Sequence, residues 1–145
     1  MMASADDVEA QFYEALASAD LERLMASWSE DDEPVCVHPG GPRVVGHAAL
    51  RTSFAAILSN GALPVRLQAV RRSQSAGCAI HHVVERIDIA TAEGTRTAWV
   101  VATNVYWKTA QGWRMVLHHA SPGTTNEPQP SESGDTAGSA PSTLH

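Results

Sequence analysis

The chain of 145 residues is 43% hydrophobic and has a formal net charge of −6, which fits one domain with a sizeable core. Nucleic acids and anionic membranes are bound by basic patches that replace counterions, so the acidic balance argues against both partners. No apolar run is long enough to span a bilayer, and the N-terminus has neither the basic nor the apolar region of a signal peptide. We therefore expect a cytoplasmic protein.

Three helices are predicted in the first part of the chain. Ser4 and the acidic residue three positions later form a capping-box pattern, and apolar residues then recur at helical spacing. Asp20 can cap a second helix, whose apolar face runs to Trp28. Gly46 begins a third helix, which the Asn60-Gly61 pair ends as a left-handed C-cap does.

The rest of the chain is predicted to form a sheet. A Pro-Gly-Gly-Pro turn at residues 39–42 separates two short strands, Val35–His38 and Arg43–Val45. Four longer strands are predicted at Leu63–Ser73, Gly77–Ala90, Arg96–Lys108 and Trp113–Ser121. Helices followed by long antiparallel strands predict an α+β domain, with three helices packed on one face of a strongly curved, mixed but mostly antiparallel sheet.

The composition changes near residue 122. Residues 1–121 are predicted to form a single domain, whereas Pro, Gly, Ser, Thr and Glu dominate residues 122–145. Such a segment buries too little apolar area to offset its ordering entropy, so a disordered tail is predicted. The two cysteines, Cys36 and Cys78, lie far apart in apolar stretches; two buried thiols are expected, with a disulfide as the alternative.

Three segments together resemble the nuclear transport factor 2-like superfamily and, within it, the SnoaL-like branch. They are Val35–Gly46, Thr103–Trp107 and Gly112–Ser121. The resemblance covers about residues 5–121. It implies a cone-shaped, cystatin-like domain with a pocket between sheet and helices, usually a homodimer through the sheet. The chemistry stays open, because this superfamily includes isomerases, cyclases, dehydratases and non-catalytic association domains.

Two segments are similar to ketosteroid isomerase, in which a helix tyrosine donates to the oxyanion and an aspartate before a proline takes the proton. Tyr13-Glu14-Ala15-Leu16 matches the tyrosine segment and His38-Pro39 matches the aspartate. The resemblance implies His38 as the base and Tyr13 as a donor, and imidazole suits proton abstraction near neutral pH. In ketosteroid isomerase a protonated aspartate on a later strand is the second donor to the oxyanion. The matching strand here contains no acid, so Thr103 or Asn104 would replace that donor. The alternatives are a histidine bonded to the turn backbone and a core tyrosine.

The last strand also resembles the association domain of calcium/calmodulin-dependent kinase, which ends in a similar Trp…His-x-Ser strand. His119 matches the terminal histidine of that module. The pocket arginines of that module are replaced here by Asn104 and Glu85, so anion binding is not implied.

The residues predicted to contact a ligand are Trp28, Glu85, Asn104 and His119. In the His118-His119 pair, His119 shares strand parity with Trp113 and is predicted to face inward. Glu85 is either a buried acid with a raised pKa or the partner of an arginine. Trp28 either lines the pocket or fills the core.

The histidine pairs raise a metal hypothesis. His38 with one imidazole each from His81-His82 and His118-His119 would match the count of a catalytic zinc site. No His-x-His or helical His-Glu motif is present, so no metal is predicted. No phosphate loop, dinucleotide fingerprint or nucleophile elbow is present either, so no cofactor is expected.

Two functions remain open beside a third hypothesis, the metal-dependent enzyme considered above. One is a homodimeric protein that binds an unidentified small molecule and acts as a cofactor-independent isomerase, cyclase or dehydratase. The other is a non-catalytic association or ligand-sensing module.

Overall fold

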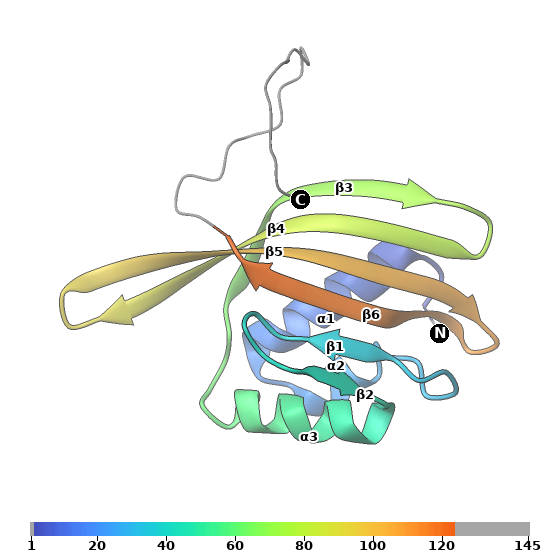
Figure 1. Cartoon of the computed structure of the whole chain (residues 1–145), viewed down its shortest axis with the longest axis horizontal. Helices are drawn as coiled ribbons and strands as arrows, with labels where there is room; N and C mark the ends of the chain where they lie inside the picture. The colour runs from blue at the N-terminus through green and yellow to red at the C-terminus, as the bar shows by residue number, and fades with distance from the viewer. Residues whose placement is uncertain (1, 124–145) are drawn as a thin grey trace, which may run out of the picture.

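The computed structural model describes residues 2–123, and Figure 1 shows how its elements are arranged. In chain order its helices and strands are α1 (Ala5–Ser18), α2 (Leu21–Met25), β1 (Val35–Val37), β2 (Arg43–Val45), α3 (His47–Leu58), β3 (Val65–Gln74), β4 (Cys78–Thr91), β5 (Gly94–Thr109) and β6 (Gly112–Pro122). The tail predicted from residue 122 lies outside the described residues, apart from its first two.

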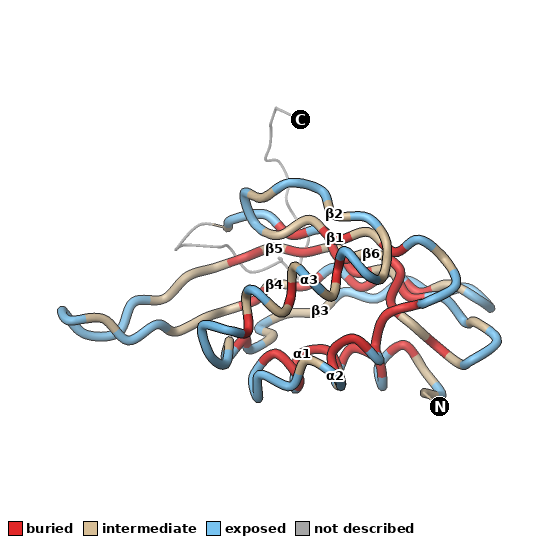
Figure 2. Tube along the Cα trace, turned by 90° about the horizontal axis from the view of Figure 1, so that it is seen from below, coloured by how far each residue is buried: buried red, intermediate tan, exposed pale blue. Residues whose placement is uncertain are grey.

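All six strands form one sheet in the order β2-β1-β6-β5-β4-β3. The β1–β6 pair is parallel and the other pairs are antiparallel, which confirms the predicted mixed, mostly antiparallel sheet. The helices cover one face of the curled sheet, and the buried residues of α1 and α2 lie on the side that faces it (Figure 2). We call this face the inner face and the opposite one the outer face.

The N-terminal ends of the helices follow the predicted capping residues, whereas α3 ends with Ser59 as a right-handed C-cap and not with the predicted left-handed cap at Asn60-Gly61. The side chain of Ser4 accepts a hydrogen bond from the backbone of α1, and the side chain of Asp20 does the same for α2. Gly46 is the N-cap of α3. Helix α2 is shorter than predicted, because Trp28 lies beyond its end and forms a backbone bridge with Met115 of β6.

Strand β6 contains an irregularity that decides which side chains face the helices. Its register with β5 shifts around Val116, which is skipped in the pairing. An extra residue in one strand moves each later side chain of that strand to the face of the sheet opposite the one that simple alternation predicts. Consequently Met115 and His118 are both buried, whereas His119 is exposed. The prediction that His119 faces inward is wrong.

The core between helices and sheet is centred on aromatic rings. The ring of Phe12 makes edge-to-face contacts with Tyr13 at 4.9 Å, with Phe54 at 6.0 Å and with Trp28 at 6.1 Å between ring centroids. Burying each large apolar side chain contributes about 1.5–3 kcal/mol to folding. This cluster joins α1, α3 and the segment after α2 into one layer.

Strands β4 and β5 continue past the rest of the sheet as a two-stranded arm (Figure 1). Most residues of the arm near its tip are exposed, and Ile89 is 48% exposed. The arm ends in a tight turn at Ala92 and Glu93, between the paired residues Thr91 and Gly94.

Candidate functional site

The inner face of a sheet covered by helices is usually lined by apolar side chains. Here one row of residues across that face is mostly polar. Its members pair in succession across five strands: Cys36, His118, Asn104, His81 and Arg72. Helix α1 presents a matching polar stripe at spacings of three and four residues, made of Asp6, Glu9 and Tyr13. The stripe and the row meet in two hydrogen-bonded groups.

The first group, which we call the Tyr13 cluster, consists of Tyr13, Glu85, Asn104 and His118. The Tyr13 hydroxyl donates to Oε2 of Glu85 at 2.6 Å and accepts from Nδ2 of Asn104 at 2.9 Å. Nδ1 of His118 donates to Oδ1 of Asn104 at 2.6 Å. All four residues are buried, and Asn104 is fully so. A continuous chain of three hydrogen bonds therefore crosses the apolar core.

Burial shifts the proton affinities within this cluster. It raises the pKa of Glu85 to about 7, although the hydrogen bond from Tyr13 opposes the shift. Burial, followed by the charge of Glu85, raises the pKa of the Tyr13 hydroxyl well above its ordinary value. Burial, followed by the nearby His38 and His119, lowers the pKa of His118 to about 3. At neutral pH, Glu85 is thus the member of the cluster that can gain or lose a proton.

His38 lies apart from this cluster, at the turn after β1. Its carbonyl accepts from the backbone N–H of Gly41 at 2.8 Å, and its Nε2 lies 2.8 Å from Oγ of Ser53 on α3. Burial lowers the pKa of the half-buried imidazole. Among the hydrogen bonds of residues 2–123, none joins His38 to Tyr13. The connection is through apolar rings, because Phe54 packs on His38 at 5.0 Å and on Phe12 at 6.0 Å.

Both cysteines are free thiols. Cys36 is buried, as predicted, whereas Cys78 is partly exposed and the prediction of a buried thiol is wrong there. Sγ of Cys36 lies 3.7 Å from Nε2 of His38. Burial and then the charge of Glu85 raise the pKa of the Cys36 thiol to about 12. Since the thiolate is the nucleophilic form, Cys36 is a packing residue at neutral pH.

Trp28 is fully buried among Phe12 and Phe54. Within the described part of the chain, its indole N–H has no hydrogen-bond partner. An unsatisfied buried donor costs about 1–3 kcal/mol. The Trp28 N–H is therefore available to an acceptor that enters the core.

The second group on the inner face lies at the other end of α1. Nδ1 of His81 donates to Oε2 of Glu9 at 3.0 Å, and the Arg72 guanidinium contacts Asp6 at 2.9 Å and Glu9 at 3.6 Å. The Tyr106 ring packs on His81 at 4.8 Å, and its buried hydroxyl lacks a partner among residues 2–123.

Asp6, Glu9 and His81 bring one ligand atom each within 4.8 Å of one another, so these three could hold a metal ion. The Arg72 guanidinium forms ion pairs with the carboxylates of Asp6 and Glu9, so this group is an ion-pair network in the structure. Among the described residues, no three histidines come together as such a ligand set.

Several residues described above, among them Glu9 and His118 in these groups and Ser53 beside His38, were not among the candidates predicted from the sequence. Glu9 could have been found, because it precedes Tyr13 by one turn on the face of α1 that is buried against the sheet. Ser53 and His118 could not, since they depend on the placement of α3 and on the register shift in β6.

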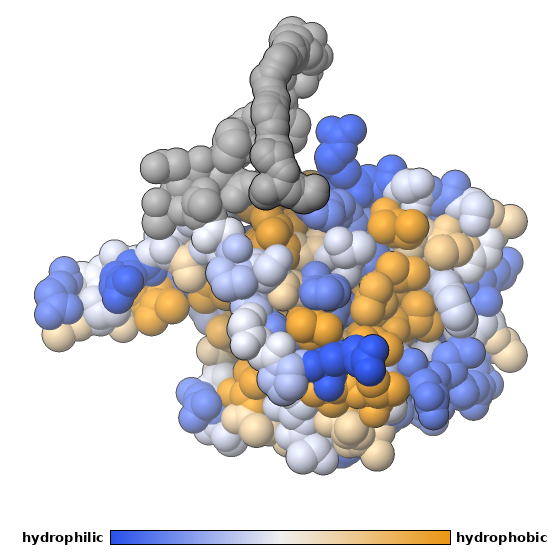
Figure 3. All heavy atoms as spheres, in the orientation of Figure 1, coloured by the Kyte–Doolittle hydropathy of each residue, from blue (hydrophilic) through white to orange (hydrophobic). Residues whose placement is uncertain are grey.

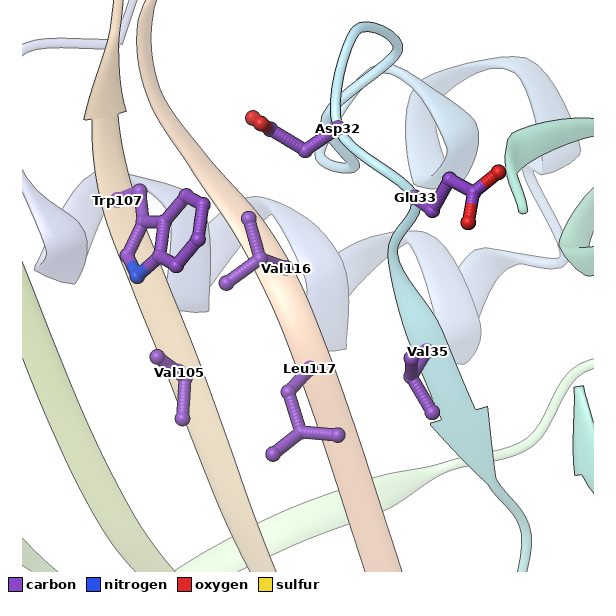
Figure 4. A pocket seen from close by; sticks show the side chains of 7 residues that line it. All are labelled: Asp32, Glu33, Val35, Val105, Trp107, Val116 and Leu117. Atoms are coloured by element: carbon purple, nitrogen blue, oxygen red, sulfur yellow. The ribbon is translucent and has the colours of Figure 1, made fainter. Parts of the chain in front are cut away.

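A hollow of about 420 Å³ lies on the outer face, away from the Tyr13 cluster. Figure 4 shows its lining side chains on β1, β5, β6 and the loop before β1: Asp32, Glu33, Val35, Val105, Trp107, Val116 and Leu117. Apart from the two carboxylates, its lining is apolar.

The family model described as a SnoaL-like domain matches residues 6–125. Among solved structures, a provisionally assigned calcium/calmodulin-dependent protein kinase type II association domain from Thiobacillus denitrificans is 34% identical, with a TM-score of 0.77, and the match covers 86% of this chain and 98% of that one. A provisionally assigned dehydratase of the NTF2-like family from Streptomyces avermitilis is 29% identical, with a TM-score of 0.72, over 79% and 90%.

An uncharacterised protein with a cystatin-like fold from Caulobacter vibrioides is 16% identical, with a TM-score of 0.71, over 83% of this chain and 88% of that one. At that identity the match supports the fold alone. Among curated proteins, none matches the chain. In the described part of the chain, no helix combines the length and apolar character needed to cross a membrane.

Proposed function

The chain belongs to the SnoaL-like domain family, and we propose that it is a homodimeric, cofactor-independent enzyme of the isomerase, cyclase or dehydratase type. Its polar centre is the Tyr13 cluster. The observation that carries the proposal is a carboxyl group, Glu85, held in the core by Tyr13 with a pKa near neutrality. Groups that titrate near working pH are the ones suited to acid–base catalysis.

The energetics of the cluster support a role beyond folding. Four polar side chains from α1, β4, β5 and β6 meet inside an apolar core. Burying polar groups costs free energy even when they are hydrogen-bonded, and apolar residues of similar volume often serve stability as well or better. Because the cluster carries this cost, it is a candidate for chemistry.

The hydrogen-bond directions give Glu85 control over Tyr13. When Glu85 is ionised, the Tyr13 proton is used in the bond to its carboxylate. When Glu85 is protonated, it can donate to the Tyr13 oxygen, and the Tyr13 O–H becomes free to donate to the carbonyl of a ligand. Asn104 holds the Tyr13 oxygen from the other side, and His118 fixes the orientation of the Asn104 amide.

His38 is the proposed base and Tyr13 the proposed hydrogen-bond donor. A neutral His38 can accept a proton at Nε2, and the Ser53 hydroxyl orients that atom. The Trp28 N–H and Asn104 are proposed as further ligand contacts. His119 takes no part in this site because it lies on the outer face.

Proton exchange tests this proposal while the natural substrate is still unidentified. A panel of cyclic and aromatic ketones is incubated with the protein in D₂O, and loss of the α-proton signals is followed by NMR. We expect catalysed exchange of at least one ketone, reduced at least tenfold by Glu85→Gln, Tyr13→Phe or His38→Ala. Glu93→Gln, which changes an exposed carboxylate at the arm tip, is the matched control. Exchange that survives all three substitutions would remove the assigned roles.

A second candidate function, a non-catalytic association module, is favoured by a separate observation. The outer face exposes large apolar side chains, with Ile80 and Trp107 each 42% exposed. A relative of 34% identity is itself provisionally assigned as an association domain. Sedimentation velocity of the full chain tests association, and stable self-association without ketone exchange would favour this candidate.

A further inference from the structure

The second polar group on the inner face, at the N-terminal end of α1, is separate from the Tyr13 cluster. Asp6 and Glu9 come from α1, His81 from β4 and Arg72 from β3, and we call these four residues the His81 group. The two carboxylates and the imidazole bring one ligand atom each within 4.8 Å of one another. What else faces the group decides whether it binds a ligand.

The buried hydroxyl of Tyr106 faces the His81 group without a partner. Tyr106 on β5 and His81 on β4 are diagonal neighbours on the inner face, and their ring centroids lie 4.8 Å apart. Burial and then the charge of Glu9 raise the pKa of Tyr106, so its oxygen lies close to that carboxylate. Among residues 2–123 the hydroxyl forms no hydrogen bond, and the amide of Asn104 already bonds to two members of the Tyr13 cluster. Because buried polar groups are almost always satisfied, this hydroxyl indicates a ligand held in the group.

The charge of the His81 group is not balanced by the chain. Asp6 and Glu9 carry two negative charges, and among the described residues Arg72 is the only arginine or lysine that pairs with either. Glu9 is 7% exposed, and a buried charge is stable only when it is compensated. A divalent cation would neutralise both carboxylates, which a single guanidinium does not.

The distances within the group suit a small divalent cation. Nδ1 of His81 lies 3.0 Å from Oε2 of Glu9, and its Nε2 lies 3.9 Å from Oδ1 of Asp6. Zinc bonds of about 2.0–2.2 Å place tetrahedral ligand atoms roughly 3.4 Å apart, which falls between these two values. An imidazole with carboxylates favours a transition-metal ion such as zinc, whereas magnesium and calcium prefer oxygen ligands alone.

Arg72 is free to give up its place to an ion. It belongs to β3, the edge strand of the sheet, and its side chain is 50% exposed. Figure 3 shows hydrophilic residues along much of that edge, so a displaced guanidinium would meet solvent. The side chain of Asp6 is 62% exposed, which gives the ion a path of entry.

We propose that Asp6, Glu9 and His81 bind a divalent transition-metal ion such as zinc. The ion replaces the Arg72 guanidinium, and the Tyr106 hydroxyl holds a water bound to it. In that position the ion ties α1 to β4, one helical turn before the tyrosine of the Tyr13 cluster. The site differs from the three-histidine set considered from the sequence, and it does not depend on the acid–base chemistry proposed above.

Zinc titration of the full chain tests the site, after dialysis against a chelator, by isothermal titration calorimetry. We expect about one ion per chain and a melting temperature that rises with zinc concentration. Glu9→Gln and His81→Asn are each expected to weaken zinc binding at least tenfold. The matched controls, Asp7→Asn and His82→Asn, change the adjacent, exposed residue of each element and are expected to bind zinc like the wild type.

Arg72→Ala distinguishes a metal site from an ion-pair network that serves only folding. Because the guanidinium competes with the ion, its removal is expected to tighten zinc binding at least threefold. Arg71→Ala, which removes the neighbouring exposed guanidinium, is the matched control and is expected to leave the affinity unchanged. Unchanged or weaker binding by Arg72→Ala would overturn the proposal, because the ion would then not take the place of that side chain.

The two variants at buried ligands need a check of folding, which circular dichroism provides. Should either of them unfold, Asp6→Asn changes an exposed ligand instead and is expected to weaken zinc binding at least threefold. A wild type that shows no saturable zinc binding overturns the proposal. Equal affinity in Glu9→Gln and the wild type also overturns it, because exposed histidines such as His82 would then be binding the metal adventitiously.

Discussion

The two faces of this sheet reverse the usual relation between polarity and burial. The inner face buries a polar row that includes His118, Asn104 and His81, whereas the outer face exposes the large apolar side chains of Ile80 and Trp107. Buried polar groups and exposed apolar groups are the informative exceptions in a globular protein. The same strands supply both, because successive residues point to opposite faces. The inner face thus points to chemistry and the outer face to a partner.

The largest effect on stability is expected at the centre of the inner row. Asn104→Leu keeps the volume but leaves the Tyr13 hydroxyl and His118 without a partner, so we expect a loss of about 2–4 kcal/mol in the free energy of unfolding. Urea denaturation measures it. The control is Thr103→Val, one residue away and on the outer face, with a change of about 0.5 kcal/mol or less. Equal losses in both variants would mean that the two faces do not differ as described.

The pH dependence of stability sharpens the comparison at Glu85. Its pKa is raised from 4.5 to about 7 in the folded state, so between those values the folded chain binds more protons than the unfolded one. Stability from this group therefore falls as pH rises from about 4.5 to 7, by at most about 3 kcal/mol.

Glu85→Gln removes that dependence. Relative to the wild type, the variant is expected to gain stability as pH rises from 5 to 8, measured by urea denaturation at several pH values. His118, whose pKa is lowered to about 3, contributes the opposite slope below about pH 6.5, and the difference between wild type and variant cancels it. A difference that is independent of pH would mean that Glu85 ionises normally.

Two buried tyrosines on the same side of the sheet form a matched pair. Tyr13→Phe removes a hydroxyl with two partners and leaves Glu85 without its donor, for an expected loss of about 1–3 kcal/mol. Tyr106→Phe removes a hydroxyl that has no partner among the described residues, so it is expected to change stability by about 1 kcal/mol or less, or to increase it. Thermal or urea denaturation compares them. A larger loss for Tyr106→Phe would show that its hydroxyl binds water or a ligand.

The smallest effect is expected on the outer face. Ile80→Thr, measured at a concentration too low for self-association, is expected to change the free energy of unfolding by about 0.5 kcal/mol or less. Val83→Thr on the buried inner face introduces a hydroxyl into the core, with an expected loss of about 1–3 kcal/mol. A loss for Ile80→Thr as large as that for Val83→Thr would contradict an exposed role for Ile80.

The sequence was a good guide to the elements and a partial guide to the site. Caps such as Ser4 and Asp20, and the glycine turns, are local signals, so the helices and strands were predicted close to their observed bounds. The facing of His118 and His119 was reversed because a register shift leaves no mark in the alternation pattern.

The contacts of the predicted site residues depend on packing, which the sequence does not encode locally. Asn104 and Glu85 were named as candidates, but their common attachment to Tyr13 joins residues 72 and 91 positions apart. His38 and Tyr13 were predicted to work together, yet in the folded chain His38 bonds to Ser53. The resemblance to known enzymes suggested His38 and Tyr13 as candidates, and the placement of α3 decided which side chain contacts His38.

The arm formed by β4 and β5 makes the molecule easy to label. Its tip at Ala92 and Glu93 projects away from the helices and from the other strands of the sheet (Figure 1). Exposed hairpin tips tolerate insertions well. A fluorophore or affinity tag introduced there would report on rotation, assembly and ligand uptake without touching the surfaces whose behaviour is being measured.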